Sequence, residues 1–170
     1  MIVDLSGVLK ETGNKIVLSG KLDLDDVRYL GEEFRFIGAP TIDGTIFNNG
    51  KSLVLKGTVN LCLGVKCARC TKDIEQNLSF ELEEALVREE DNTDPDSDAI
   101  VFAGNEIDIT DIVQMGFFMN VPGKFLCKDD CKGLCPTCGA DLNAGDCQCN
   151  MEGIDPRWEA LKKIMDSDEN

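Results

Sequence analysis

The sequence of 170 residues contains no histidine. Histidine is the commonest general acid or base near neutral pH and the usual ligand of a catalytic zinc ion. Two nucleotide-binding patterns are also missing, namely the G-x-x-x-x-G-K-[ST] loop that holds phosphates and the G-x-G-x-x-G turn that binds dinucleotides. These absences predict a protein that is not an enzyme and that has no small-molecule substrate.

Long apolar runs are missing as well. No uninterrupted stretch approaches the roughly 18 residues that a membrane-spanning helix needs. The first residues include Asp4 and no basic segment followed by an apolar run, which argues against a secretory signal peptide. We therefore expect a cytoplasmic protein with no membrane partner.

Positive charge is scarce, with 17 Lys and Arg against 32 Asp and Glu and a formal net charge of −15. A protein of this charge repels a phosphate backbone at long range and favours basic partners. Residues 89–98 are nearly all acidic or small and polar, which predicts a solvated loop. That loop could also act as a decoy surface for basic proteins.

Cysteine, in contrast, is abundant, with nine residues in the chain. In a reducing cytosol, cysteines at metal-ligand spacing bind metal more often than they form disulfides. Eight of them make two structural zinc sites if each ion takes four thiolates. The predicted ligands are Cys67, Cys70, Cys127, Cys131, Cys135, Cys138, Cys147 and Cys149.

The division of these thiols between two ions rests on their spacing. Cys135-Pro-Thr-Cys138-Gly has the form of a zinc knuckle, and Cys147-Gln-Cys149 adds a close second pair. The remaining four would then form the other site: Cys67, Cys70, Cys127 and Cys131. A zinc ribbon that uses Cys67, Cys70, Cys135 and Cys138 is a second possible pairing.

The pattern of the first 121 residues predicts an antiparallel β-sheet or barrel-like core, in a mainly β (α+β) fold. Apolar and polar residues alternate over 53–66 and again over 74–86, which indicates two long, half-buried strands. The Cys67/Cys70 pair lies at the tip of the hairpin that these strands form. Residues 2–9 and 15–22 predict another hairpin, and residues 23–33 predict a loop or short helix.

Two short helices complete the expected architecture. Residues 109–120 show apolar side chains on one helical face, and residues 155–166 begin with Asp155 as N-cap and Pro156 at the first helical position. Trp158 and Leu161 lie on one face of this second helix, which predicts docking on the protein's own core. We thus expect a core over 1–121, a cysteine-rich zinc segment over 122–154 and a C-terminal amphipathic helix over 155–166.

Basic residues gather near the thiols of the first proposed site. If its four cysteines share one ion, six cations surround that ion: Lys66, Arg69, Lys72, Lys124, Lys128 and Lys132. These cations either offset the thiolate charge or provide a focused RNA contact. The ninth cysteine, Cys62, is expected to be an unliganded thiol on the polar face of its strand.

The Cys67-Ala-Arg-Cys70 tip resembles the corresponding element of the bacterial YceD family. So does the C-terminal run from Cys127 through Cys131-Lys-Gly-Leu-Cys135-Pro-Thr-Cys138-Gly to Cys149 and Asp155-Pro-Arg157. The resemblance implies a role in the accumulation of large-subunit ribosomal RNA. The resemblance also implies that the gene commonly lies beside the gene for a small protein of the large ribosomal subunit.

The leading hypothesis is therefore a non-catalytic, zinc-binding factor in ribosome biogenesis, which contacts a ribosomal protein, ribosomal RNA or a pre-ribosomal particle. An alternative is a thiol oxidoreductase or redox sensor that uses Cys67 and Cys70, with neighbouring cations lowering the thiol pKa. A zinc-dependent transcription accessory module is a third possibility.

Overall fold

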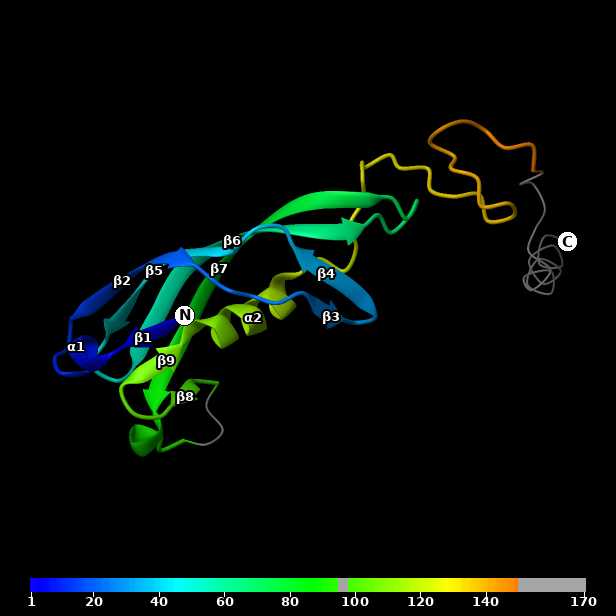
Figure 1. The fold of residues 1–170 in the computed structure, drawn as a ribbon. Coiled ribbons are helices and arrows are strands. Elements are labelled where there is room, and N and C mark those ends of the chain that lie inside the picture. Colours follow the sequence, from blue (N-terminus) through cyan, green and yellow to red (C-terminus); the bar gives the residue numbers. More distant parts are fainter. Residues whose placement is uncertain (95–97, 150–170) are drawn as a thin grey trace, which may run out of the picture. The chain divides into compact units, whose positions relative to one another are not determined.

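The computed structural model describes residues 1–94 and 98–149 (Figure 1). The chain divides into two compact units, Met1–Cys127 and Lys128–Asn170. All helices and strands of the described residues belong to the first unit. They are β1 (Ile2–Asp4), α1 (Ser6–Leu9), β2 (Lys15–Lys21), β3 (Val27–Tyr29), β4 (Glu32–Phe36), β5 (Thr41–Asn48), β6 (Leu53–Lys66), β7 (Asp73–Arg88), the 3-10 turn η1 (Glu89–Asp91), β8 (Ile100–Phe102), β9 (Glu106–Asp108) and α2 (Ile109–Asn120).

The long hairpin of β6 and β7 is the centre of the sheet, and it confirms the two strands predicted from alternation. The strands pair in antiparallel register from Leu53 with Leu86 to Lys66 with Asp73. One face of β6 is buried almost throughout, and the other carries exposed or half-buried residues apart from the buried Gly64. This alternation fixes the register, because a slip of one residue would turn every apolar side chain to the wrong face.

The other strands extend the sheet from this hairpin. β5 and β4 both pair with β6, β2 pairs with β5, and β3 pairs with β4, all antiparallel. β8 joins the free edge of β7 as the single parallel partner in the described sheet. The result is a mainly antiparallel β fold, as the sequence predicts.

Helix α2 covers the buried face of the sheet, where Figure 1 shows it beside the hairpin. Asp108 is its N-cap and accepts a hydrogen bond from the backbone N–H of Thr110. Gly116 permits close contact, because a Cβ atom there would lie 2.7 Å from Leu82 Cδ1. Phe117 is fully buried against the rings of Phe34 and Phe36.

The predicted hairpin of residues 2–9 and 15–22 is wrong. The first strand ends at Asp4 and pairs with β9, and residues Ser6–Leu9 form the short helix α1. Leu5 and Val8 are both fully buried, and their spacing of three places them on one side of a helical turn. β2 instead pairs with β5, far along the chain, and such a partner cannot be read from local pattern.

Residues 23–33 also differ from the expected loop or short helix, because they contain β3 and the start of β4. The turn between these strands places Leu30 and Gly31 at positive φ, of 50° and 86°. Two consecutive residues at positive φ are typical of the tight type I′ hairpin turn. The usual sequence signal is Asn-Gly, so Leu30-Gly31 did not reveal this turn.

The predicted helix over 155–166 lies outside the described residues.

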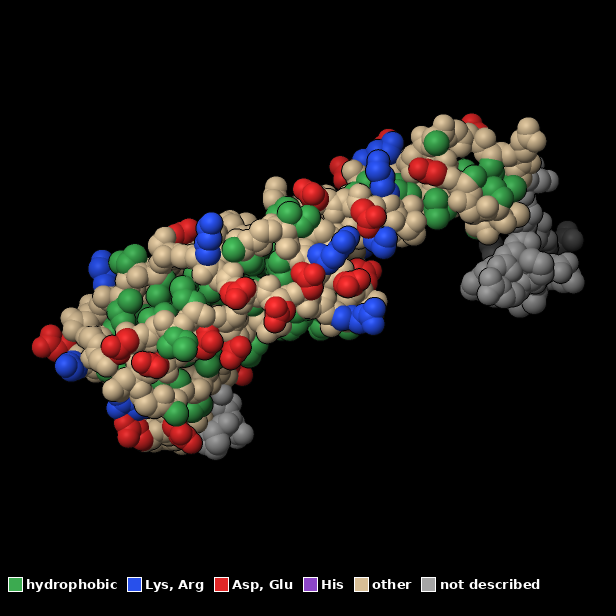
Figure 2. Space-filling model, in the orientation of Figure 1, with side chains coloured by type: hydrophobic (Ala, Val, Ile, Leu, Met, Phe, Trp, Pro, Cys, Tyr) green, Lys and Arg blue, Asp and Glu red, His purple; other side chains and the backbone are tan. Residues whose placement is uncertain are grey.

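Among the helices of the described ranges, none is long and apolar enough to cross a membrane. Acidic side chains are spread over the visible face of the first unit, with fewer basic ones between them (Figure 2).

Candidate metal centre

Two turns of the chain have the same hydrogen-bond pattern, and each carries a C-x-x-C pair. In the first, Cys67 N–H donates to the Lys72 carbonyl at 2.8 Å, and Thr71 N–H donates to the Cys67 carbonyl at 2.9 Å. In the second, Cys135 N–H donates to Ala140 and Gly139 N–H donates to Cys135, both at 2.8 Å. The sequence predicted a knuckle at Cys135 and a hairpin tip at Cys67, and the two turns are equivalent in their backbone bonds.

The first turn closes the hairpin of β6 and β7, so the two long strands hold its thiols in place. Backbone N–H groups point at the sulfur of Cys67, first that of Cys70 and then those of Cys127 and Arg69. These donors lower the pKa of the Cys67 thiol to about 6. The turn is also tied to the later chain, because Ala68 N–H donates to the Phe125 carbonyl at 2.8 Å.

The sulfurs of one group of four cysteines lie within 4.8 Å of one another: Cys67, Cys70, Cys127 and Cys131. A tetrahedral zinc ion with bonds of about 2.3 Å would place its sulfur ligands roughly 3.8 Å apart. The Sγ atoms of Cys70 and Cys127 are 3.7 Å apart, far beyond a disulfide bond. The donor set and this spacing therefore fit a four-coordinate metal ion.

A second group with the same 4.8 Å limit lies wholly in the second unit: Cys135, Cys138, Cys147 and Cys149. The backbone N–H groups of Cys138 and Thr137 lower the pKa of the Cys135 thiol to about 6. The pKa of Cys149 is raised to about 12, first by its hydrogen bond with Cys138 and then by burial. Without a cation, Cys135 thus favours the thiolate and Cys149 the neutral thiol. A metal ion among these sulfurs would favour the thiolate form of each cysteine, because metal binding deprotonates its ligands.

These two groups have the membership that the knuckle spacing suggested. No group among the described residues combines Cys67 and Cys70 with Cys135 and Cys138, as the ribbon alternative required. That each group binds zinc stays a prediction. Cys62 belongs to neither group and is half-buried on β6.

Asn143 is a contact of the thiols that the sequence analysis missed. Its side-chain amide donates to the Sγ atom of Cys131 at 3.5 Å, and its Oδ1 atom accepts from Lys132 N–H at 2.9 Å. An amide donor to a metal-binding sulfur stabilises the thiolate and orients it. The only signal was the Asp141-Leu-Asn143 turn, which is too common to single out.

The cations near the first group are partly compensated by acids. Lys66 Nζ lies 3.0 Å from Asp73, and Lys128 Nζ lies 3.7 Å from Asp130. Asp73 also lies 3.8 Å from Arg35. These pairs reduce the net positive charge that the sequence suggested for this region, although exposed pairs contribute little stability.

Together, the fold and the thiol groups define a β-sheet protein with a cysteine-rich segment and two candidate structural metal sites. The chain belongs to the YceD family, because residues 55–165 match the family described as Large ribosomal RNA subunit accumulation protein YceD.

Relatives differ in how much of this chain they match. An uncharacterized protein of Mycobacterium bovis, Mb2951c, is 28% identical over 127 residues, or 73% of this chain and 61% of its own length. The chain thus matches less than two thirds of that relative. The uncharacterized protein YlbN of Bacillus subtilis is 22% identical over 149 residues, or 87% of both chains.

A plant relative carries a functional name. The chloroplastic YCED homolog 1 of Zea mays, named a large ribosomal RNA subunit accumulation protein, is 38% identical over 58 residues, or 32% of this chain and 20% of its own length. No solved structure matches this chain.

Proposed function

We propose that this chain is a non-catalytic, zinc-binding factor that acts in the cytoplasm in the accumulation of large-subunit ribosomal RNA. It would act through contacts with a ribosomal protein, ribosomal RNA or a pre-ribosomal particle. The observation that carries the proposal is the family match over residues 55–165, which includes all eight clustered cysteines.

Zinc is the metal that the donor set favours. Four thiolates without histidine or carboxylate suit a tetrahedral structural zinc ion, and both groups offer only sulfur. Four protein ligands leave no open position for water or a substrate, so the ions would shape the chain instead of performing chemistry. Each group would hold one ion.

The redox alternative has less support. A reactive C-x-x-C pair usually lies at the N-terminus of a helix. Here the pKa of Cys67, about 6, is lowered by backbone N–H groups of a knuckle turn, and the pKa of Cys135 in the second group is lowered in the same way. Cys67 and Cys70 lie between two strands, and no helix of the described residues begins there. The sulfur of Cys70 also lies close to that of Cys127, so the pair is not isolated.

The proposal is tested in a strain that lacks the gene, complemented with the wild-type chain or with Cys67→Ser, Cys135→Ser or Cys62→Ser. We expect loss of the gene to lower the ratio of large- to small-subunit ribosomal RNA. The wild-type chain and Cys62→Ser should restore the ratio, and the two other variants should fail to do so. An unchanged ratio in the deletion strain would refute a role in accumulation.

Whether the direct contact is protein or RNA can be separated by co-purification. The tagged chain is isolated from the complemented strain with and without nuclease treatment. A ribosomal protein that stays bound after nuclease indicates a protein contact, and its loss together with the RNA indicates an RNA contact.

A further inference from the structure

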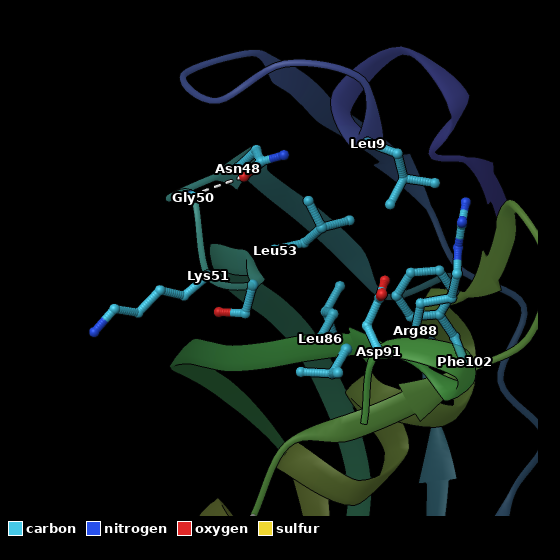
Figure 3. A pocket seen from close by; sticks show the side chains of 11 residues that line it. Leu9, Asn48, Gly50, Lys51, Leu53, Leu86, Arg88, Asp91 and Phe102 are labelled. Carbon is cyan, nitrogen blue, oxygen red and sulfur yellow. Dashed lines mark hydrogen bonds between the residues drawn. The ribbon is translucent and has the colours of Figure 1, made fainter. Parts of the chain in front are cut away.

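A pocket of about 310 Å³ lies in the first unit, at the end of the β6–β7 hairpin opposite the thiols. Figure 3 shows the side chains that line it. Its floor is apolar and includes Leu53, Leu86 and Phe102, which are at most 6% exposed. Its walls come from the 48–52 turn and from the end of β7 with η1.

The turn that forms one wall is fixed by its own hydrogen bonds. The side-chain amide of Asn48 donates to the Val8 carbonyl at 3.0 Å, and its Oδ1 atom accepts from Gly50 N–H at 2.8 Å. Asn49 Oδ1 accepts from the N–H groups of Lys51 and Ser52, both at 2.8 Å. The pocket wall is therefore largely formed before a ligand arrives, which reduces the entropy cost of binding.

The opposite wall carries an acid without a partner. The guanidinium of Arg88 donates to Glu90 and, at 2.7 Å, to Asn105, so its charge is paired with one carboxylate, while its buried Nε atom has no partner among the described residues. Asp91 has neither a hydrogen bond nor an ion pair through its side chain among residues 1–94 and 98–149. In Figure 3 its carboxylate points to the space below Leu9, whereas Lys51 extends away from the other labelled side chains.

We propose that this pocket binds a lysine or arginine side chain of a basic protein partner. The aliphatic stem of such a side chain would cover the apolar floor, and its charged end would meet the Asp91 carboxylate. Glu89, which is exposed and lies two residues before Asp91 in η1, adds negative charge to this turn. The inference rests on the proposed function in one respect: it takes a ribosomal protein, rather than RNA, as the direct contact of the chain.

The same charges disfavour RNA at this place. A phosphate group brought to the pocket would meet Asp91 and the other acids of η1. Of the two cations that line the pocket, Arg88 is paired with Glu90 and Lys51 extends away from the other labelled side chains (Figure 3). A cationic side chain therefore fits the pocket better than a phosphate does.

The test uses the full-length, zinc-loaded chain and a fluorescein-labelled nonapeptide of alternating lysine and glycine. Two matched peptides carry norleucine, which has an uncharged aliphatic side chain, or glutamate in place of lysine. Asp91→Asn removes the pocket carboxylate, and Glu89→Gln removes one exposed negative charge two residues away. Methyl NMR shifts of Leu9, Leu53 and Leu86 report on where the peptide binds.

We expect the lysine peptide to shift these methyl signals and to bind Asp91→Asn about tenfold more weakly, while Glu89→Gln changes affinity less than twofold. The norleucine and glutamate peptides should bind weakly. Equal losses in both variants, absence of the methyl shifts, or displacement of the peptide by an oligouridylate that causes the same shifts would overturn the inference. The ribosomal RNA ratio of the deletion strain tests the proposed function separately.

Discussion

One position of the two knuckle turns has the same backbone conformation but a different side chain. Thr71 has a φ of 58° and Gly139 a φ of 75°, so both residues are left-handed. This region costs a residue with a Cβ atom about 1–2 kcal/mol, and glycine avoids the cost. The first turn is therefore strained at Thr71, whereas the second turn is not strained at Gly139.

Exchanging these residues should shift metal affinity in opposite directions. We expect Gly139→Thr to weaken zinc binding at the second site roughly tenfold, since a Cβ atom at 139 would meet nothing within 4 Å and backbone strain alone would act. Thr71→Gly should strengthen the first site by up to about fivefold.

The measurement is competition with a chromophoric chelator. Each change is made in a protein with a single intact site, Cys67→Ser for the second turn and Cys135→Ser for the first. Equal affinity with threonine and glycine at position 139 would show that this turn bears no strain.

The ninth cysteine provides a matched control for the eight clustered ones. We expect Cys67→Ser and Cys135→Ser each to lower the zinc content from two ions to about one, because three thiolates hold zinc poorly. Cys62→Ser should leave both ions in place, since Cys62 belongs to neither thiol group. Native mass spectrometry gives the count, and loss of an ion from the Cys62 variant would contradict the assignment.

At the level of elements, a pair of glycines allows β5 and β6 to approach closely. Gly44 and Gly57 are register partners. A Cβ atom on Gly44 would lie 2.3 Å from the Lys56 carbonyl oxygen and 2.6 Å from Gly57 Cα. Both are backbone atoms of the central strand, so they cannot move aside as a flexible side chain can.

Gly44→Ala should therefore destabilise the sheet by roughly 2–3 kcal/mol in urea unfolding, as overpacking does in a core. Gly20→Ala in β2 is the matched control, because its added Cβ atom would lie 3.5 Å from Met1 Sδ, an ordinary contact. The control should be neutral or slightly stabilising, within about 1 kcal/mol. Equal stability of the two variants would argue against the close approach.

The elements also show how far the sequence predicts the fold. The β6–β7 hairpin was predictable because its register follows from alternation and from one turn. The partner of β2 was not, since β5 begins only at Thr41, and its pairing depends on tertiary contacts. The second thiol group could be proposed because its knuckle spacing is local, and the first followed as the four cysteines that remained. Asn143 and the Asp91 pocket, in contrast, arise from folding.

At the level of the whole molecule, the buried apolar side chains are concentrated in the first unit. The buried apolar cluster of the described residues ends at Phe125. From residue 128 to 149 the buried residues with apolar side chains are Cys131 and Cys135. The first unit therefore has a core of its own, and the described part of the second unit, residues 128–149, depends on the group that binds its sulfurs.

Removal of metal should consequently unfold the segment after residue 128, while the sheet of the first unit stays folded. After treatment with a strong chelator under reducing conditions, we expect trypsin to cleave after Lys132 at least tenfold faster, because cleavage requires local unfolding of the segment around it. Lys56 lies within β6, and the bond after it should stay resistant. The strand signal in circular dichroism should persist.

Mass spectrometry of the fragments identifies the cleaved bonds, and re-addition of zinc should restore protection. Unchanged cleavage after Lys132, or loss of the strand signal at the same chelator concentration, would show that metal does not organise the chain in this way.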